Sequence, residues 1–318
     1  MTDTALPGFL DAHVHLALTD AAGPAALLAG GISRVLDLGG WPLGAGVGPS
    51  PVIRGAGQLL TAPGGYPSRA PWAPPGSVFQ VTSTAGATDA TAAVDLQLAG
   101  GASVVKITLN SDAGPVFSDT VLAAIVAHAH TQGVAVVVHA QGHGQAQRAF
   151  EAGVDAFAHT PFSERLGDDL IGAMAARLTW ISTLDIHGWG RPAREFDAAV
   201  DNLRRFHARG GRVLYGTDLG NGPLPVGVNP REIRALLTAG LSPDAVIAAL
   251  TDGAGGAEPA LGIDWGPAVR HTRLIGPQPA EPQAFTDWLG TARSVAGPLP
   301  IPTTLSSPAT PAAREALR

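Results

Sequence analysis

The chain has 318 residues, of which 45% are hydrophobic and 14% charged, and this length suffices for one large α/β core. Its formal charge of -6 gives no electrostatic reason to bind nucleic acid or an anionic membrane, so we expect neither as a partner. Because cysteine is absent, disulfides and thiolate metal sites are excluded, and a metal must be bound by histidine, carboxylate or a modified lysine.

Eight short strands are predicted in chain order, with amphipathic helical stretches between them. The strands are Phe9–Leu16, Ser33–Leu38, Val52–Leu60, Ser103–Leu109, Ala135–Ala140, Ala156–Thr160, Thr179–Leu184 and Arg212–Asp218. Several are continuous runs of Val, Ile and Leu, which is typical of parallel strands buried on both faces. Eight such units predict a (β/α)8 barrel; the competing open doubly wound sheet lacks a Gly-rich fingerprint after the first strand.

The alternating pattern fades at about Gly266. Residues Pro267–Arg318 are Pro-rich, with weak strand-like pieces near Arg270–Ile275 and Ala292–Ala296. We therefore predict a barrel domain of residues 1–266 followed by an irregular C-terminal extension of residues 267–318. The first residues have no basic start and no apolar run of signal-peptide length, so we expect a cytoplasmic protein.

Polar residues follow apolar strands at several predicted strand ends. His13 and His15 end the first strand and, being two residues apart, point the same way, which suits a divalent metal. His139, His159 and Asp218 end the fifth, sixth and eighth strands. Because the C-terminal ends of barrel strands meet at one face, where catalysis occurs, these side chains predict a common metal site.

Lys106 interrupts the apolar fourth strand, Ser103–Leu109. A buried lysine is costly unless it is paired or neutralised. One interpretation is an ion pair with Asp218 or another carboxylate. The other is a lysine carboxylated by carbon dioxide, which would be an anion able to bridge two metal ions.

The motifs GFLDAHVHL, VVKI, VVVHA, AFAHT and YGTD, in this order, resemble the amidohydrolase superfamily. The stretch Gly101–Thr160 and the segment TAGLSPDAVIAALT are most similar to its imidazolonepropionase-like and prolidase-like branch, and the resemblance covers about residues 7–266. It implies two divalent metal ions, which we expect to be zinc. The implied ligands are His13 and His15 for the more buried ion, His139 and His159 for the second, carboxylated Lys106 between them, and Asp218, which also shuttles protons.

Members of this branch carry a β-sandwich module built from strands before the first histidines and after the barrel. Here the histidines come almost at once, so we expect this module to be reduced or missing, with the C-terminal extension as its remnant. The possible homo-oligomer is therefore left open.

The expected activity is hydrolysis of an amide in a small molecule such as a dipeptide, an N-acyl amino acid or a cyclic amide. A hydroxide bridging the two ions would attack the carbonyl, and Asp218 would carry its proton to the leaving group. The alternatives are a lactonase or esterase with the same centre, a mononuclear deaminase, and a metal-binding barrel without catalysis.

The loops after the strands should form the substrate pocket. Six residues in such loops are candidates for substrate contact: Trp41, Tyr66, Asn110, His143, His187 and Asn221. Tyr66 and His187 are the strongest of these, and Tyr66 could donate a hydrogen bond to a substrate carbonyl. Packing or an ordinary surface position is the alternative for each of them.

Overall fold

The computed structural model of the chain describes residues 3–20, 23–40, 49–82, 87–254 and 257–300. In chain order its strands are β1 (Thr4–Pro7), β2 (Phe9–Val14), β3 (Ile32–Asp37), β4 (Val52–Gly55), β5 (Leu59–Thr61), β6 (Val78–Gln80), β7 (Val105–Asn110), β8 (Val136–Gln141), β9 (Ala156–Phe157), β10 (Thr179–Ile181), β11 (Arg212–Leu214), β12 (Arg270–Leu274) and β13 (Arg293–Ala296). Its helices are α1 (Gly23–Ala29), α2 (Ala87–Ala99), α3 (Asp119–Thr131), α4 (Gln145–Glu151), α5 (Asp168–Ala175), α6 (Arg194–His207), α7 (Pro230–Thr238), α8 (Pro243–Leu250) and α9 (Pro282–Leu289). Two 3-10 helices, η1 (Leu16–Leu18) and η3 (Leu184–Ile186), follow β2 and β10.

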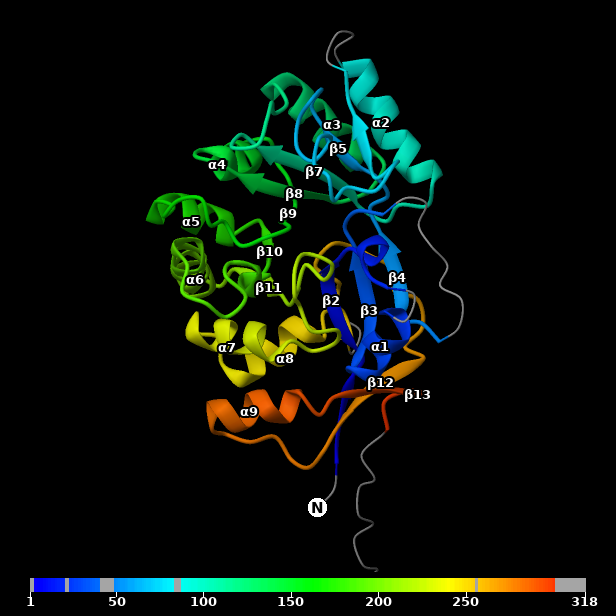
Figure 1. Cartoon of the computed structure of the whole chain (residues 1–318), viewed down its shortest axis with the longest axis vertical. Helices are drawn as coiled ribbons and strands as arrows, with labels where there is room; N and C mark the ends of the chain where they lie inside the picture. Colours follow the sequence, from blue (N-terminus) through cyan, green and yellow to red (C-terminus); the bar gives the residue numbers. More distant parts are fainter. Residues whose placement is uncertain (1–2, 21–22, 41–48, 83–86, 255–256, 301–318) are drawn as a thin grey trace, which may run out of the picture.

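The parallel strands form two arcs, β2-β3-β4 and β11-β10-β9-β8-β7-β5-β6. Backbone hydrogen bonds join the arcs at both ends. Ala12 N donates to Tyr215 O at 2.9 Å, beside β2 and β11, and Ser103 N donates to Gly55 O at 2.8 Å, beside β7 and β4. The strands therefore close a parallel α/β barrel, as predicted, with α4 to α8 on its outer side (Figure 1).

Packing between the strands and the outer helices is clear at β10 and α6. The ring of Trp180 on β10 stacks on Phe206 of α6, with centroids 3.8 Å apart and planes 4° apart. Helix α6 has acidic residues in its first turn and Arg204, Arg205 and His207 in its last, which complements its dipole. Val200, Leu203 and Phe206 form its buried face, which fixes α6 against the sheet.

The predicted strands differ from those observed by one to four residues at their ends, and the third, sixth, seventh and eighth differ most. The predicted third strand, Val52–Leu60, is divided into β4 and β5, and Gly57 between them has a left-handed φ of 70°. The sixth and eighth end earlier than predicted, at Phe157 and Leu214. The chain leaves the strand ladder there, and the freed residues include His159 and Asp218.

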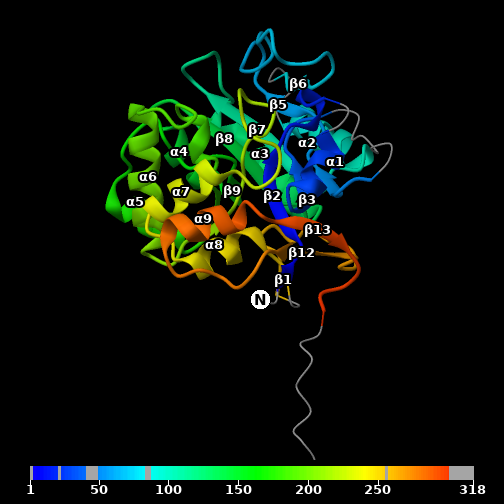
Figure 2. The ribbon, with the colours of Figure 1, turned by 60° about the horizontal axis from the view of Figure 1, so that its bottom comes forward.

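The two ends of the described chain meet in a second, antiparallel sheet of β1, β12 and β13 (Figure 2). The predicted strand-like pieces correspond to β12 and β13. Strand β1 before Phe9 and helix α9 were not predicted, and the structure adds both. Phe285 and Leu289 on α9 are fully buried in the main core, so this part of the extension is packed rather than irregular. Residues 301–318 of the extension lie outside the described residues.

Within the described residues, no helix has both the length and the apolar character needed to cross a membrane.

Candidate metal centre

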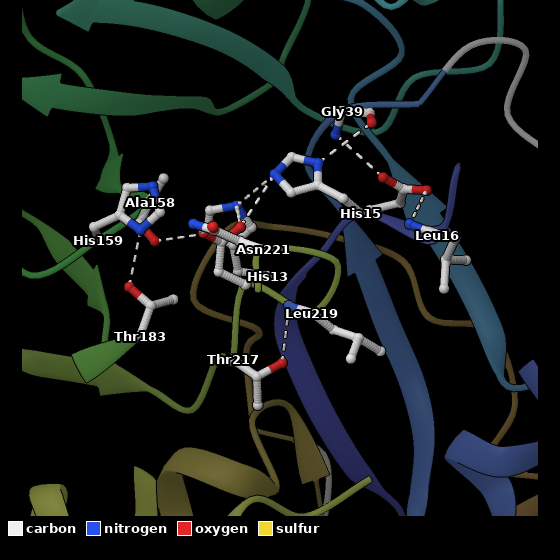
Figure 3. A network of polar contacts seen from close by, with 12 residues as sticks. His13, His15, Leu16, Gly39, Ala158, His159, Thr183, Thr217, Leu219 and Asn221 are labelled. Carbon is white, nitrogen blue, oxygen red and sulfur yellow. Dashed lines mark hydrogen bonds and ion pairs between the residues drawn. The ribbon is translucent and has the colours of Figure 1, made fainter. Parts of the chain in front are cut away.

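His13 and His15 lie at the end of β2 with their Nε2 atoms 3.2 Å apart. His13 Nδ1 is 2.8 Å from the carbonyl oxygen of Ala158, and His15 Nδ1 is 3.3 Å from that of Gly39. A carbonyl only accepts, so each Nδ1 carries the proton, and in its neutral form each ring keeps a lone pair on Nε2. The two Nε2 atoms approach each other (Figure 3), which is an arrangement suited to a cation when both rings are neutral.

Asp218 brings a third acceptor to this point. Its Oδ1 lies 3.2 Å from Nε2 of both His13 and His15, and this buried oxygen has no hydrogen-bond donor among the described residues. Burial alone would raise the pKa of Asp218, but the neighbouring His13, His15 and His159 outweigh it and hold the pKa well below its usual range. An ionised carboxylate beside two imidazole lone pairs needs a positive charge, which a divalent metal would supply.

The backbone holds Asp218 in an unusual conformation. Its φ is 59°, in the left-handed region that non-glycine residues seldom adopt. Asp218 N donates to His13 O at 2.8 Å, and Asn221 Nδ2 donates to Asp218 Oδ2 at 2.8 Å. The carboxylate is thus fixed against β2 at a local cost in strain, which is typical of functional sites.

His159 and His139 approach from β9 and β8. The ring of His159 lies 4.7 Å from His13 and 5.0 Å from His139, between centroids. Burial lowers the pKa of His139 to about 3 and that of His159 well below its usual value, so both rings are neutral and can act as ligands. Possible ligand atoms of His13, His159 and Asp218 all lie within 4.8 Å of one another.

Lys106 of β7 also lines this site and is 2% exposed. It is the only lysine in the chain, because the other 19 of the 20 Lys and Arg residues are arginines. Among the described residues it makes no ion pair, so the paired interpretation from the sequence is not observed. Burial lowers its pKa to about 7, and a large share of the amine is therefore neutral at physiological pH.

Two residues that hold the candidate site residues in place were not predicted from the sequence. Asp11 accepts hydrogen bonds from Thr217 N at 3.0 Å and from His13 N at 3.1 Å, so it ties β2 to the segment that carries Asp218. Thr183 Oγ1 lies 2.9 Å from His159 Nδ1. Asp11 could have been found, because it continues the two-residue spacing of His13 and His15; the position of Thr183 is set by a loop and leaves no such signal.

A cavity of about 540 Å³ opens above these ligands, a size suited to a small molecule. Tyr66, His187 and Asn221, three of the residues predicted to contact substrate, line it. His143 is not among its lining residues; it lies 3.2 Å from Glu164 Oε2 with a 92% exposed side chain. Trp41 lies outside the described residues.

Asn110 is buried at the end of β7, beside His139. Its Nδ2 donates to Gln141 Oε1 at 3.0 Å and lies 3.4 Å from His139 Nε2. Its Oδ1 accepts from Ala113 N at 3.1 Å, which fixes the orientation of the amide. Asn110 is thus placed to orient His139 rather than to line the cavity.

The profile of the amidohydrolase family matches residues 4–264. This chain belongs to the amidohydrolase family. The resemblance found in the motifs is thereby confirmed. No curated protein sequence matched the chain in the comparison.

Solved structures similar to this amidohydrolase share its fold at low identity. A Xaa-Pro dipeptidase with bound methionine in its active site has a TM-score of 0.69 at 20% identity, covering 91% of this chain and 84% of its own. The A. niger ochratoxinase has a TM-score of 0.69 at 18% identity, covering 91% and 81%. Phenylurea hydrolase B has a TM-score of 0.66 at 17% identity, covering 92% and 84%.

Proposed function

We propose that this amidohydrolase is a metal-dependent hydrolase that cleaves an amide bond of a small molecule. The observation that carries the proposal is the convergence of Asp218 Oδ1 with the Nε2 atoms of His13 and His15, three buried acceptors without a donor. Among the similar structures are a dipeptidase and a phenylurea hydrolase, whose names both denote hydrolysis at a C–N bond. This favours an amide over an ester.

We propose two divalent ions, with zinc as the metal. His13, His15 and Asp218 would hold one, His139 and His159 the other, and carboxylated Lys106 would bridge them. The neutral amine that burial produces is the form that reacts with carbon dioxide, and the product is an anion suited to the centre. Bound divalent ions would supply hydroxide from water at neutral pH and polarise the scissile carbonyl.

The residues around the centre have distinct proposed roles. The Asp218 carboxylate, held by Asn221, accepts the proton of the attacking water and returns it to the leaving nitrogen. Burial raises the pKa of Tyr66 to about 12, so its hydroxyl stays protonated and can donate to the substrate oxygen. The Tyr66 ring stacks on His139 with centroids 5.2 Å apart, which places the phenol beside the centre.

The single lysine allows a direct test of the bridge. Protein equilibrated with 13C-bicarbonate should show a lysine carbamate signal by NMR and about two divalent ions per chain by metal analysis. Lys106→Arg, which keeps a basic side chain but cannot form the bridge, should lose the signal and at least one ion. One ion per chain in the wild type, with Lys106 unmodified, would favour the mononuclear deaminase instead.

Turnover is tested with Asp218→Asn. The variant should keep the fold by circular dichroism and lose amide hydrolysis, and an active variant would contradict the proton-shuttle role. A panel of amides, esters and lactones separates the amidase from the lactonase. A wild type that binds two ions and hydrolyses none of them would support the metal-binding barrel without catalysis.

We also propose that the β1-β12-β13 sheet is the reduced β-sandwich module, with residues 267–318 as an extension of the barrel domain.

A further inference from the structure

The walls of the cavity above the metal centre are aromatic. Tyr66 and Trp72 lie on one wall, in the loop between β5 and β6, with ring centroids 5.9 Å apart. Phe162 lies against His187 with centroids 4.2 Å apart, and Trp189 follows on the same loop as His187. The chain has 17 Phe, Trp and Tyr residues, and four of them line this cavity.

Trp72 and Trp189 are each 41% exposed, and both line this cavity. Large exposed apolar surfaces are a common mark of ligand-binding sites. Trp189 has a left-handed φ of 51°, and its Nε1 donates to Asn221 O at 3.3 Å. The indole is therefore held beside the cavity in a strained conformation while remaining accessible, which favours a role in contacting a ligand.

The described residues that line the walls include no arginine and no carboxylate away from the floor, where Lys106 and Asp218 lie. Burial lowers the pKa of His187 to about 4, so its ring is neutral at pH 7. Residues 41–48 and 83–86, which are outside the described chain, contain no charged residue in the sequence. A substrate carboxylate in this cavity would therefore be desolvated without a cationic side chain, which is costly.

From these walls we infer, on the basis of the proposed hydrolase function, that the substrates are uncharged amides bearing an aromatic ring, such as anilides. The ring would lie among Tyr66, Trp72, Phe162 and Trp189, and the amide carbonyl would face the metal centre. Hydrolysis adds the hydroxyl of water to the carbonyl carbon and breaks the C–N bond. The nitrogen leaves with the proton as an aromatic amine, the acid is the second product, and no oxidant or reductant is needed.

The test uses the metal-loaded enzyme and three acetamides of similar size. These are N-(4-methylphenyl)acetamide, its 4-carboxylate analogue and N-hexylacetamide, which lacks a ring. We expect kcat/KM for the uncharged anilide to exceed both others by about tenfold or more. Preference for the carboxylate, or equal rates for the ringless amide, would overturn the inference.

Binding without turnover gives the same comparison independently. The ketones in which CH2 replaces the amide NH of the two anilides cannot be hydrolysed, and calorimetry with the metal-loaded enzyme gives their Kd. We expect the uncharged ketone to bind about tenfold more tightly or better, and the reverse order would overturn the inference even in the absence of turnover.

Variants at the exposed indoles separate the walls from the centre. Trp189→Ala should raise KM for the anilide with little change in metal content, whereas Ile275→Ala, at a residue 66% exposed that does not line the cavity, should leave KM unchanged. Trp72→Arg adds a cation and should shift the preference toward the carboxylate analogue. Failure of the proposed function has another signature: no metal bound and no amide cleaved by any protein in the series.

Discussion

Replacing Thr183 by valine should weaken metal binding at His159 while leaving the barrel folded. Thr183 Oγ1 lies 2.9 Å from His159 Nδ1, and both residues are buried. For His159 to offer Nε2 to a metal, its Nδ1 must carry the proton and donate to this hydroxyl. Valine has the same branched shape as threonine, so its backbone strain at the left-handed φ of 44° should equal that of Thr183. The substitution therefore removes only the hydroxyl.

The size of the effect follows from the lost contact. A buried donor left without its acceptor costs about 1–3 kcal/mol. Loss of a residue that orients a metal ligand typically lowers metal affinity or activity about 10–100-fold. This factor corresponds to about 1.4–2.7 kcal/mol, so the two figures agree.

Zinc affinity can be measured by competition with a chromophoric chelator, and the fold by thermal unfolding of the metal-free protein. Thr183→Ser keeps the hydroxyl and should bind zinc nearly as tightly as the wild type. Equal zinc affinity for Thr183→Val and the wild type would refute the reasoning, because the hydroxyl would then only stabilise the loop.

Three further effects are expected. Burial raises the pKa of Glu232 to about 7 from an ordinary 4.5. Between these values the native state retains a proton that the unfolded chain has lost, so the unfolding free energy falls as pH rises from about 4.5 to about 7. In denaturant unfolding, Glu232→Gln should remove about 2–3 kcal/mol of the change in unfolding free energy between pH 5 and 8. The same slope of unfolding free energy against pH for the variant and the wild type would contradict this. A Cβ on Gly216 would lie 2.4 Å from Ile181 Cγ2, so Gly216→Ala should lower the thermal midpoint by several degrees. Gly210→Ala is the control, because a Cβ there meets nothing within 4 Å and only the left-handed φ of 81° costs stability. Chelation of bound metal should lower the thermal midpoint of the wild type, because the ligands come together only in the native state, and an unchanged midpoint would argue against a metal bound at this centre.

The predictable part of the site lies on the strands. His13 and His15 were paired by the alternation of a strand, and His139 ends an apolar run, so a regular hydrogen-bond ladder fixes where these side chains point. His159 and Asp218 were also located, although their strands stop earlier than predicted. Asp218 adopts a left-handed φ that depends on Asp11 and Asn221, and no periodic pattern encodes such a contact.

The parts that could not be predicted depend on contacts distant in sequence. Strand β1 has four residues and forms by pairing with β12, as in the register Thr4 with Leu274. Neither segment has a strong strand pattern alone, because the pairing stabilises both. The C-terminal extension was expected to be irregular because of its proline content. Its helix α9 is instead stabilised by burial of Phe285 and Leu289 in the core, a contact with residues distant in sequence.

The proposed metal ligands and the proposed specificity residues lie in different parts of the fold. The proposed metal ligands lie on barrel strands or within four residues of their ends, so the barrel sets their positions. The walls belong to loops, where Trp189 has a left-handed φ, a backbone hydrogen bond from its N to Asp185 O and an indole hydrogen bond to Asn221 O. Substitutions in these loops can therefore alter which amide is accepted while the centre stays intact. For this reason Trp72→Arg, on a loop residue far along the chain from the ligands of β2, should change the preference between the two anilides and leave the metal content as it is.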